Sequence, residues 1–162
     1  NHRVNGLVGA AFRIKSMYGE IICDGNHSTY AALHNFFEEK GPHYGMLVSD
    51  ALMAKGSPAG SKFIFGGNEI EIYEDGSAHL TSSKSLAGST LCINDGLRIL
   101  IEEALVPVDT AINACTKNPA ACLGIEDRKG SIKVGLDADL AVLDRDYKVL
   151  QTYCRGEAML GR

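Results

Sequence analysis

The sequence predicts an α/β fold, and two patterns lead to that prediction. Two short apolar segments, 20–24 and 45–51, flank a longer segment with helical periodicity, which is the order of a βαβ unit with parallel strands. From Lys62 onward the hydrophobic pattern changes to a period of two, which predicts a β-meander inserted after that unit. The 162 residues, of which 45% are hydrophobic and 22% charged, are enough for one globular domain with a core.

The charge balance limits the partners that this chain could have. The formal net charge is −4 and the isoelectric point is about 5.7, with no run of lysine and arginine. That balance argues against nucleic acid or an anionic membrane as the main partner and favours a small molecule. No apolar stretch approaches the roughly 20 residues of a membrane span, and the first residues do not resemble a signal peptide. We therefore expect a soluble, cytoplasmic protein.

The first half of the chain supplies the predicted βαβ unit. Its expected elements are a short helix at 6–14, a strand at 20–24, a helix capped by Ser28 or Thr29 that runs to about Lys40, and a strand at 45–51. Gly41 follows the helix and supplies the left-handed residue that commonly ends one. The last strand is too short and too uniformly apolar to be read as a helix.

Two titratable side chains follow the two predicted strands. Asp50 leaves the end of a buried strand, where a carboxylate is costly to desolvate unless it is paired or takes part in chemistry. In parallel α/β folds that chemistry lies at the carboxyl ends of strands, so Asp50 is a candidate general base, with a helix cap or turn carboxylate as the alternative. His27 leaves the same edge of the sheet, although a lone histidine is commonly structural. The pattern predicts that these two side chains converge.

The second half is predicted to begin and end with antiparallel strands. Apolar residues alternate around two hairpin turn signals, Gly66–Asn68 and Asp75–Gly76. The small-residue loop Ser85–Ser89 follows and would let the backbone approach a ligand closely. Beyond it we expect a helix at 92–105, a helix from about Asp109, a short helix after Asn118–Pro119 that ends at Gly124, and strands at 140–143, 148–153 and 157–160.

Other polar residues carry weaker functional signals. Arg3 suits a phosphate or a carboxylate because a guanidinium binds either group bidentately, although an arginine is more often a solvated surface residue. The remaining histidines lack the spacing of a metal site, and the glycines lack the context of a nucleotide-binding loop. Spacing alone therefore predicts neither kind of site.

Four motifs occur here in the order of one known family. They are Asp24-Gly25-Asn26-His27, Leu47-Val48-Ser49-Asp50-Ala51, Leu86-Ala87-Gly88-Ser89, and the segment 130–140 with its Gly-Leu-Asp-Ala-Asp-Leu. With these motifs the chain resembles the N-acetylglucosamine-6-phosphate deacetylases of the amidohydrolase superfamily over essentially its whole length. The start, His2-Arg3-Val4-Asn5-Gly6, is similar to that family's His-Arg-Glu-Pro-Gly. The last motif is generic to amidohydrolases, whereas the first three together are specific to the deacetylases.

The resemblance implies a (β/α)8 barrel of which this chain holds the C-terminal part. Residues 1–128 would form the last strands and helices of the barrel, with the meander at about 62–81, and residues 129–162 would supply strands of a small β-sandwich domain. The two parallel strands would be the seventh and eighth strands of the barrel. Members of the family are more than twice as long as this chain.

The resemblance also implies a reaction and a set of site residues. The family removes the acetyl group of N-acetylglucosamine 6-phosphate with water activated by a divalent metal ion, zinc or similar. Asp50 would be the catalytic acid and base, Asp24, Gly25, Asn26 and His27 would line the sugar phosphate site, Leu86, Ala87 and Gly88 would close over the substrate, and Arg3 would contact the phosphate. In relatives this arginine reaches the site of the neighbouring subunit, which implies a homodimer.

Two departures from the family pattern matter. The family's metal ligands, a glutamate and two histidines, lie on strands that precede this chain, so we expect no metal ligand within it and an inactive protein if the 162 residues are isolated. Val4-Asn5 replaces the usual acid and proline, which leaves the placement of Arg3 open. Two other interpretations remain, namely an amidohydrolase acting on another amide or a cyclic amidine, and a non-enzymatic fragment in which these residues are inherited scaffold.

Overall fold

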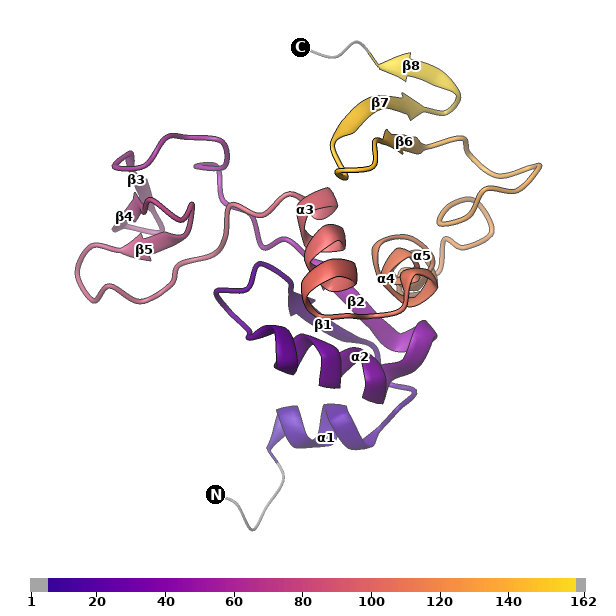
Figure 1. The fold of residues 1–162 in the computed structure, drawn as a ribbon, viewed down its shortest axis with the longest axis horizontal. Coiled ribbons are helices and arrows are strands. Elements are labelled where there is room, and N and C mark those ends of the chain that lie inside the picture. The colour runs from indigo at the N-terminus through magenta and orange to yellow at the C-terminus, as the bar shows by residue number, and fades with distance from the viewer. Residues whose placement is uncertain (1–5, 160–162) are drawn as a thin grey trace.

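The structure, a computed structural model, describes residues 6–159 and is a mixed α/β arrangement (Figure 1). In chain order its elements are α1 (Leu7–Arg13), β1 (Gly19–Ile22), α2 (Tyr30–Tyr44), β2 (Gly45–Val48), β3 (Lys62–Phe65), β4 (Asn68–Ile72), β5 (Ala78–Leu80), α3 (Ile93–Arg98), the π-helical turn η1 (Ile99–Glu103), α4 (Val108–Cys115), α5 (Lys117–Cys122), β6 (Leu140–Leu143), β7 (Val149–Cys154) and β8 (Glu157–Met159). Within the described range the strands form three sheets, β1 with β2, β3 to β5, and β6 to β8. No helix of that range is long and apolar enough to cross a membrane.

The predicted βαβ unit is confirmed. β1 and β2 pair in parallel along their whole length, and α2 connects them. α2 starts where the sequence indicates, because the hydroxyl oxygen of Thr29 accepts a hydrogen bond of 3.2 Å from the N–H of Ala32. Gly41 has a left-handed φ of 61° and interrupts the helix, but helical turns resume after it and continue to Tyr44. The predicted end of the helix at this glycine is therefore a kink.

β2 is shorter than the sequence predicts. It ends at Val48 and does not reach Ala51, because Asp50 takes a positive φ of 48°, which an extended strand does not allow. Ala51 forms a single parallel bridge with Ser89 instead. The chain that leaves β2 is thus paired with the loop before α3 and no longer with β1.

The main core lies between the βαβ unit and the helices that follow it. Phe36 and Phe37 of α2 pack in one cluster with Leu47 of β2. Leu33 of α2 and Leu100 of η1 belong to the same cluster and have no exposed surface. Burying one such side chain contributes about 1.5–3 kcal/mol. This cluster therefore fixes the two parallel strands against α2, η1 and α4.

A buried lysine ties α1 to this core. Lys40 is 3% exposed. Its ammonium group donates to the carbonyl oxygens of Ala11, Ile14 and Met17, at 2.5, 3.2 and 2.7 Å. These three partners compensate much of the cost of removing the charge from water, although burial still lowers the pKa of Lys40. The last turn of α1 and the loop before β1 are in this way anchored from α2.

The predicted β-meander is also confirmed. β3, β4 and β5 pair in antiparallel order and stand to one side of the βαβ unit (Figure 1). Its turns use glycines with positive φ at Gly66, Gly67 and Gly76. A second, smaller cluster of buried apolar residues belongs to it, made of Ala54, Ile70, Ile72 and Ala78. The meander therefore has a core of its own.

The helix predicted at 92–105 is in fact two elements. The α-helical turns of α3 end at Arg98, and the wider π-helical turn η1 follows, in which Ala104 donates its N–H to the carbonyl of Ile99 at 2.9 Å. Leu105 then adopts a left-handed φ of 54° and ends the segment. The later helices are confirmed with small shifts: α4 starts at Val108, α5 starts at Lys117, and Gly124 has the positive φ of a helix stop.

The tail forms the three antiparallel strands that the sequence predicts, β6 to β8. Several large apolar side chains remain exposed before and outside this sheet, namely Leu7, Val8, Leu123, Ile132 and Val134, at 81, 71, 72, 91 and 100%. β1 and β2 each have only one neighbouring strand in the described range. The described chain thus leaves two strand edges and a large apolar surface uncovered.

Candidate active site

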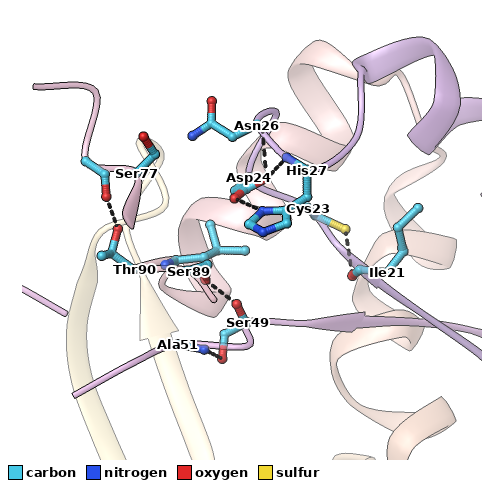
Figure 2. Close-up of polar contacts among 12 residues, drawn as sticks. Ile21, Cys23, Asp24, Asn26, His27, Ser49, Ala51, Ser77, Ser89 and Thr90 are labelled. Atoms are coloured by element: carbon cyan, nitrogen blue, oxygen red, sulfur yellow. Dashed lines mark hydrogen bonds and ion pairs between the residues drawn. The ribbon is translucent and has the colours of Figure 1, made fainter. Parts of the chain in front are cut away.

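The carboxyl ends of β1 and β2 bring the predicted site segments to one edge of the sheet. Because the strands are parallel, with Ile22 opposite Val48, the chain leaves both in the same direction. The turn that carries Asp24 and His27 follows β1, and the segment that carries Asp50 follows β2. Figure 2 shows the first turn beside Ser49 and Ser89, which come from different parts of the chain. Both segments leave the same edge of the sheet, as predicted, but no contact joins the side chains of His27 and Asp50 in the described residues, and Asp50 does not line the pocket that His27 lines.

The turn after β1 is organised by the Asp24 carboxylate. Its Oδ1 accepts hydrogen bonds from the backbone N–H groups of Asn26 and His27, both at 2.9 Å. Its Oδ2 lies 2.7 Å from Nδ1 of the His27 ring. The side chains of Asp24 and His27 are 11% and 22% exposed, so the pair is largely removed from solvent. The turn is therefore a local motif whose polar groups satisfy one another.

Asp50 has a different environment. Asp50 is exposed, and no described residue donates a hydrogen bond to its carboxylate. Its backbone, in contrast, is fixed in a left-handed conformation, which costs about 1–3 kcal/mol for a residue other than glycine. A carboxylate that is free at its tip and strained at its backbone is in a position to act on a ligand, and such strain is common at functional sites.

Ser89 holds the strained segment in place. Its backbone N–H donates to the carbonyl of Asp50 at 2.8 Å, and its own carbonyl accepts from the N–H of Leu52 at 2.8 Å. Its hydroxyl group donates to the carbonyl of Ser49 and accepts from the N–H of Leu91 at 3.1 Å. Ser89 is only 2% exposed, so these bonds are shielded from water. The loop before α3 therefore sets the conformation of Asp50.

Gly88 is required for this close approach. It has a left-handed φ of 61°, and a Cβ atom built on it would lie 2.8 Å from the side chain of Leu52 and 3.2 Å from the carbonyl oxygen of Asp50. A methyl group does not fit at those distances. The small residues of the Leu86–Ser89 motif thus bring one backbone against another.

A pocket of about 170 Å³ lies beside these segments. It is lined by Asp24, Asn26 and His27 after β1, by Asp75, Gly76 and Ser77 in the turn before β5 and Ala78 at its start, and by Gly88, Ser89, Thr90, Leu91, Cys92 and Asp95 before and in α3. Three of the lining residues are aspartates, so the pocket suits groups that donate hydrogen bonds better than it suits an anion. Asp50 is not part of this lining, but its carbonyl accepts a hydrogen bond from the N–H of Ser89, which is.

The wall formed by the meander is the part of the site that the sequence did not indicate. Thr90 donates its hydroxyl to the carbonyl of Gly76 at 2.6 Å, which ties the meander turn to the loop before α3. Asp75 accepts from the hydroxyl and the N–H of Ser77 at 2.5 and 2.9 Å, and these bonds lower the pKa of Asp75. The sequence showed Asp75–Gly76 only as a hairpin turn, because its partner at Thr90 is distant in the chain.

Of the remaining predicted site residues, one lines the pocket and the others do not or lie outside the described residues. Gly88 lines the pocket, whereas Leu86 and Ala87 pair with β5, the latter through an N–H bond of 2.9 Å to the carbonyl of Ala78. Gly25 is not in the lining but has a positive φ of 79°, which the turn requires. Arg3 lies outside the described residues.

The described residues do not form a metal site by themselves. In the range 6–159 no group of three histidine, cysteine or acidic side chains is close enough to hold a metal ion. Asp50 could contribute one oxygen ligand at most, and a catalytic zinc site takes about three protein ligands. The donor set in this part of the chain therefore does not fit a resident metal ion.

Comparison with known proteins relates the whole chain to one group of enzymes. The model of the amidohydrolase family matches residues 32–159. An N-acetylglucosamine-6-phosphate deacetylase of Bacillus subtilis is 38% identical over 156 residues, which are 96% of this chain and 39% of that protein. A putative N-acetylgalactosamine-6-phosphate deacetylase of Escherichia coli K12 is 32% identical over 97% of this chain and 92% of its own length.

Solved structures agree with these relationships. An N-acetylglucosamine-6-phosphate deacetylase from Pasteurella multocida superposes with a TM-score of 0.91 and 28% identity, over 99% of this chain and 41% of that one. A mutant of the Mycobacterium smegmatis enzyme in complex with N-acetyl-D-glucosamine-6-phosphate gives a TM-score of 0.89 at 27% identity, over 98% of this chain and 42% of that one. The chain thus spans about two fifths of the length of most of these relatives.

Proposed function

This chain belongs to the amidohydrolase family, and from that premise we propose that it is the C-terminal part of a deacetylase that converts N-acetylglucosamine 6-phosphate to glucosamine 6-phosphate and acetate. The likeness to deacetylases that act on two amino-sugar phosphates supports this substrate class. One observation carries the proposal: the Asp24–His27 turn, the Asp50 segment and the Gly88–Ser89 loop, which lie far apart in the sequence, meet at the carboxyl edge of two parallel strands.

In the proposed reaction Asp50 is the acid and base. It takes a proton from the water that attacks the acetamide carbonyl, so that the water oxygen forms a bond to the carbonyl carbon. The carbon–nitrogen bond then breaks, and Asp50 returns the proton to the amine that leaves. Acetate is the other product. An exposed carboxylate on a rigid, strained backbone suits this exchange of one proton.

The family resemblance implies that a divalent metal ion activates the water, yet the described residues do not fit such an ion alone. We therefore propose that its ligands come from outside residues 6–159. By the same reasoning the isolated 162 residues should be inactive.

His27 and the pocket would hold the sugar. The pocket carboxylates of Asp75 and Asp95 would accept hydrogen bonds from sugar hydroxyl groups. The same carboxylates repel a phosphate, which would therefore lie at the rim, where Arg3 would contact it. That arginine would come from the neighbouring subunit of a homodimer.

The uncovered surfaces support the proposed place in a larger barrel. β1 and β2 would be the seventh and eighth strands, and their free edges would pair with barrel strands outside the described residues. The part up to residue 128 would complete the barrel, and β6 to β8 would join a small β-sandwich from residue 129 onward. Exposed residues such as Leu7 and Val134 would then be covered.

The proposal is tested by measuring the intact mass and bound metal of the purified protein together with acetate release. The substrates are N-acetylglucosamine 6-phosphate, its galactosamine isomer and a cyclic amidine. We expect a mass well above 17.3 kDa, a bound divalent metal ion, and turnover of an amino-sugar phosphate only. The isomer belongs in the panel because one relative carries that name. Turnover of the amidine, or a metal-bound protein of larger mass that releases no acetate, would contradict the proposal.

A further inference from the structure

We propose that Asp24 is a positioning residue rather than a substrate ligand: it fixes the tautomer and the orientation of His27, so that Nε2 is the ring nitrogen that meets the sugar. This inference rests on the proposed function only for the identity of the ligand. The arrangement of the two side chains stands on the geometry of the turn.

The Asp24 carboxylate has little capacity left for a substrate. Oδ1 accepts two backbone N–H groups, those of Asn26 and His27, each at 2.9 Å. A carboxylate oxygen has two lone-pair sites, so Oδ1 is fully used. Oδ2 lies 2.7 Å from Nδ1 of His27, and the Asp24 side chain is only 11% exposed. The group therefore serves the turn and the imidazole ring.

This geometry selects one tautomer of His27. An ionised carboxylate accepts hydrogen bonds and cannot donate one, so Nδ1 must carry the proton. In the neutral ring Nε2 is then an acceptor. The described residues contain no buried side-chain nitrogen or oxygen without a partner, and no described residue bonds to Nε2, so this atom is open to solvent. His27 lines the pocket, and Nε2 is the one ring nitrogen still available there.

The turn is packed closely against the start of α2. Gly25 has a φ of 79°, and a Cβ atom built on it would lie 2.9 Å from the Tyr30 ring. Tyr30 is the first residue of α2, which Thr29 caps. The chain on both sides of His27 is thus anchored, and the Oδ2 contact fixes the ring itself.

The chemistry of Nε2 fits a sugar hydroxyl. When the ring is neutral, Nε2 is an acceptor that binds an O–H donor, whereas a phosphate dianion has no proton to offer it. Asp75 and Asp95 line the same pocket and also disfavour an anion next to His27. We therefore assign to His27 a hydroxyl group of the amino sugar.

The tautomer can be read directly from the ring nitrogen shifts of the 15N-labelled protein as purified. We expect Nδ1 of His27 to be the protonated nitrogen. In Asp24→Asn the amide oxygen keeps the two backbone N–H bonds and the amide NH2 faces Nδ1, so the proton should move to Nε2. His34 is the internal control, because its Nδ1 lies 2.9 Å from the carbonyl of Ala104 and its tautomer should not change. An Nε2–H tautomer of His27 in the native protein, or no change in Asp24→Asn, would overturn the proposal.

Ligand titration separates this inference from the proposed function. Asp24→Asn should bind N-acetylglucosamine 6-phosphate roughly 10- to 100-fold more weakly, by analogy with the loss of a carboxylate that orients a metal-bound histidine. Binding of inorganic phosphate should not weaken, because the charge that is lost repels it. Equal weakening for both ligands, or unchanged affinity for the sugar phosphate, would overturn the assigned hydroxyl contact. If the native protein shows the expected tautomer but binds no amino-sugar phosphate, the proposed function fails and the role of Asp24 stands.

Discussion

The Asp24–His27 turn and the Asp50 segment lie at the same edge of the sheet but are shaped by different parts of the chain. In the turn every hydrogen bond joins residues two or three positions apart. Asp50 instead depends on Ser89, which also bonds to Ser49 across a separation of 40 residues. The bonds of the first half lie within four consecutive residues, whereas those of the second half form only when the loop before α3 has docked.

This difference predicts which changes are transmitted through the site. A substitution in the Gly88–Ser89 loop should disturb the Asp50 segment and leave the Asp24–His27 bond intact. A substitution beside the turn, in the cap of α2, should leave both intact, because the bonds of the turn lie within residues 24–27. Three substitutions test this, in order of decreasing effect.

Gly88→Ala should have the largest effect. The new Cβ would lie 2.8 Å from Leu52, and such overpacking costs about 1–3 kcal/mol, to which the left-handed φ adds about 1–2 kcal/mol. Urea unfolding of the purified protein measures the sum. Gly56→Ala is the matched control, because Gly56 has a φ of 83° with nothing within 4 Å of its Cβ position, so only the backbone cost applies. Equal losses for both variants would show that the close approach at Gly88 is not important.

Ser89→Ala should have an intermediate effect. It removes the bond from the hydroxyl to the Ser49 carbonyl and leaves that carbonyl without a partner, which costs about 1–3 kcal/mol in free energy of unfolding. Turnover should fall as well, because the backbone of Asp50 is less well fixed. Ser82→Ala, at an exposed serine after β5, is the control and should change neither quantity. Normal turnover in Ser89→Ala would mean that Asp50 needs no such support.

Thr29→Ala should have the smallest effect. The loss of the N-cap bond to Ala32 costs about 1 kcal/mol. Thr29→Ser keeps the hydroxyl and should restore the stability. The ring nitrogen shifts of His27 should be the same in all three proteins, because its bonds lie within residues 24–27. A changed tautomer would show that the turn is less independent than the structure indicates.

The difference between local and distant contacts also explains how much of the molecule could be predicted from its sequence. Local signals predicted the two strands of the βαβ unit, the meander turns and the start of β6 at Leu140, and they limited the cap of α2 to Ser28 or Thr29, of which the structure uses Thr29. Periodicity also placed His27 and Asp50 at one edge, because strand direction alone decides which edge they leave.

Features set by distant contacts were missed. The positive φ of Asp50 follows from its bonds to Ser89, and the wall at Asp75–Ala78 follows from the bond between Thr90 and Gly76. The π-helical turn at 99–103 was expected to be ordinary helix, because its sequence has a normal apolar stripe and both Ile99 and Leu100 are buried. The sequence within a few residues of each feature contains no pattern that would have indicated it.

Asp50 is the residue proposed to carry out the proton exchange, and Asp50→Asn removes the group that would accept the proton. Asparagine has the same shape and tolerates a positive φ, so the fold should be unchanged, but it cannot accept the proton of the attacking water. We predict that acetate release from N-acetylglucosamine 6-phosphate falls by roughly 10²- to 10⁴-fold, with an unchanged free energy of unfolding. Asp146→Asn, at an exposed aspartate between β6 and β7, should keep full turnover. Full turnover in Asp50→Asn would contradict the account.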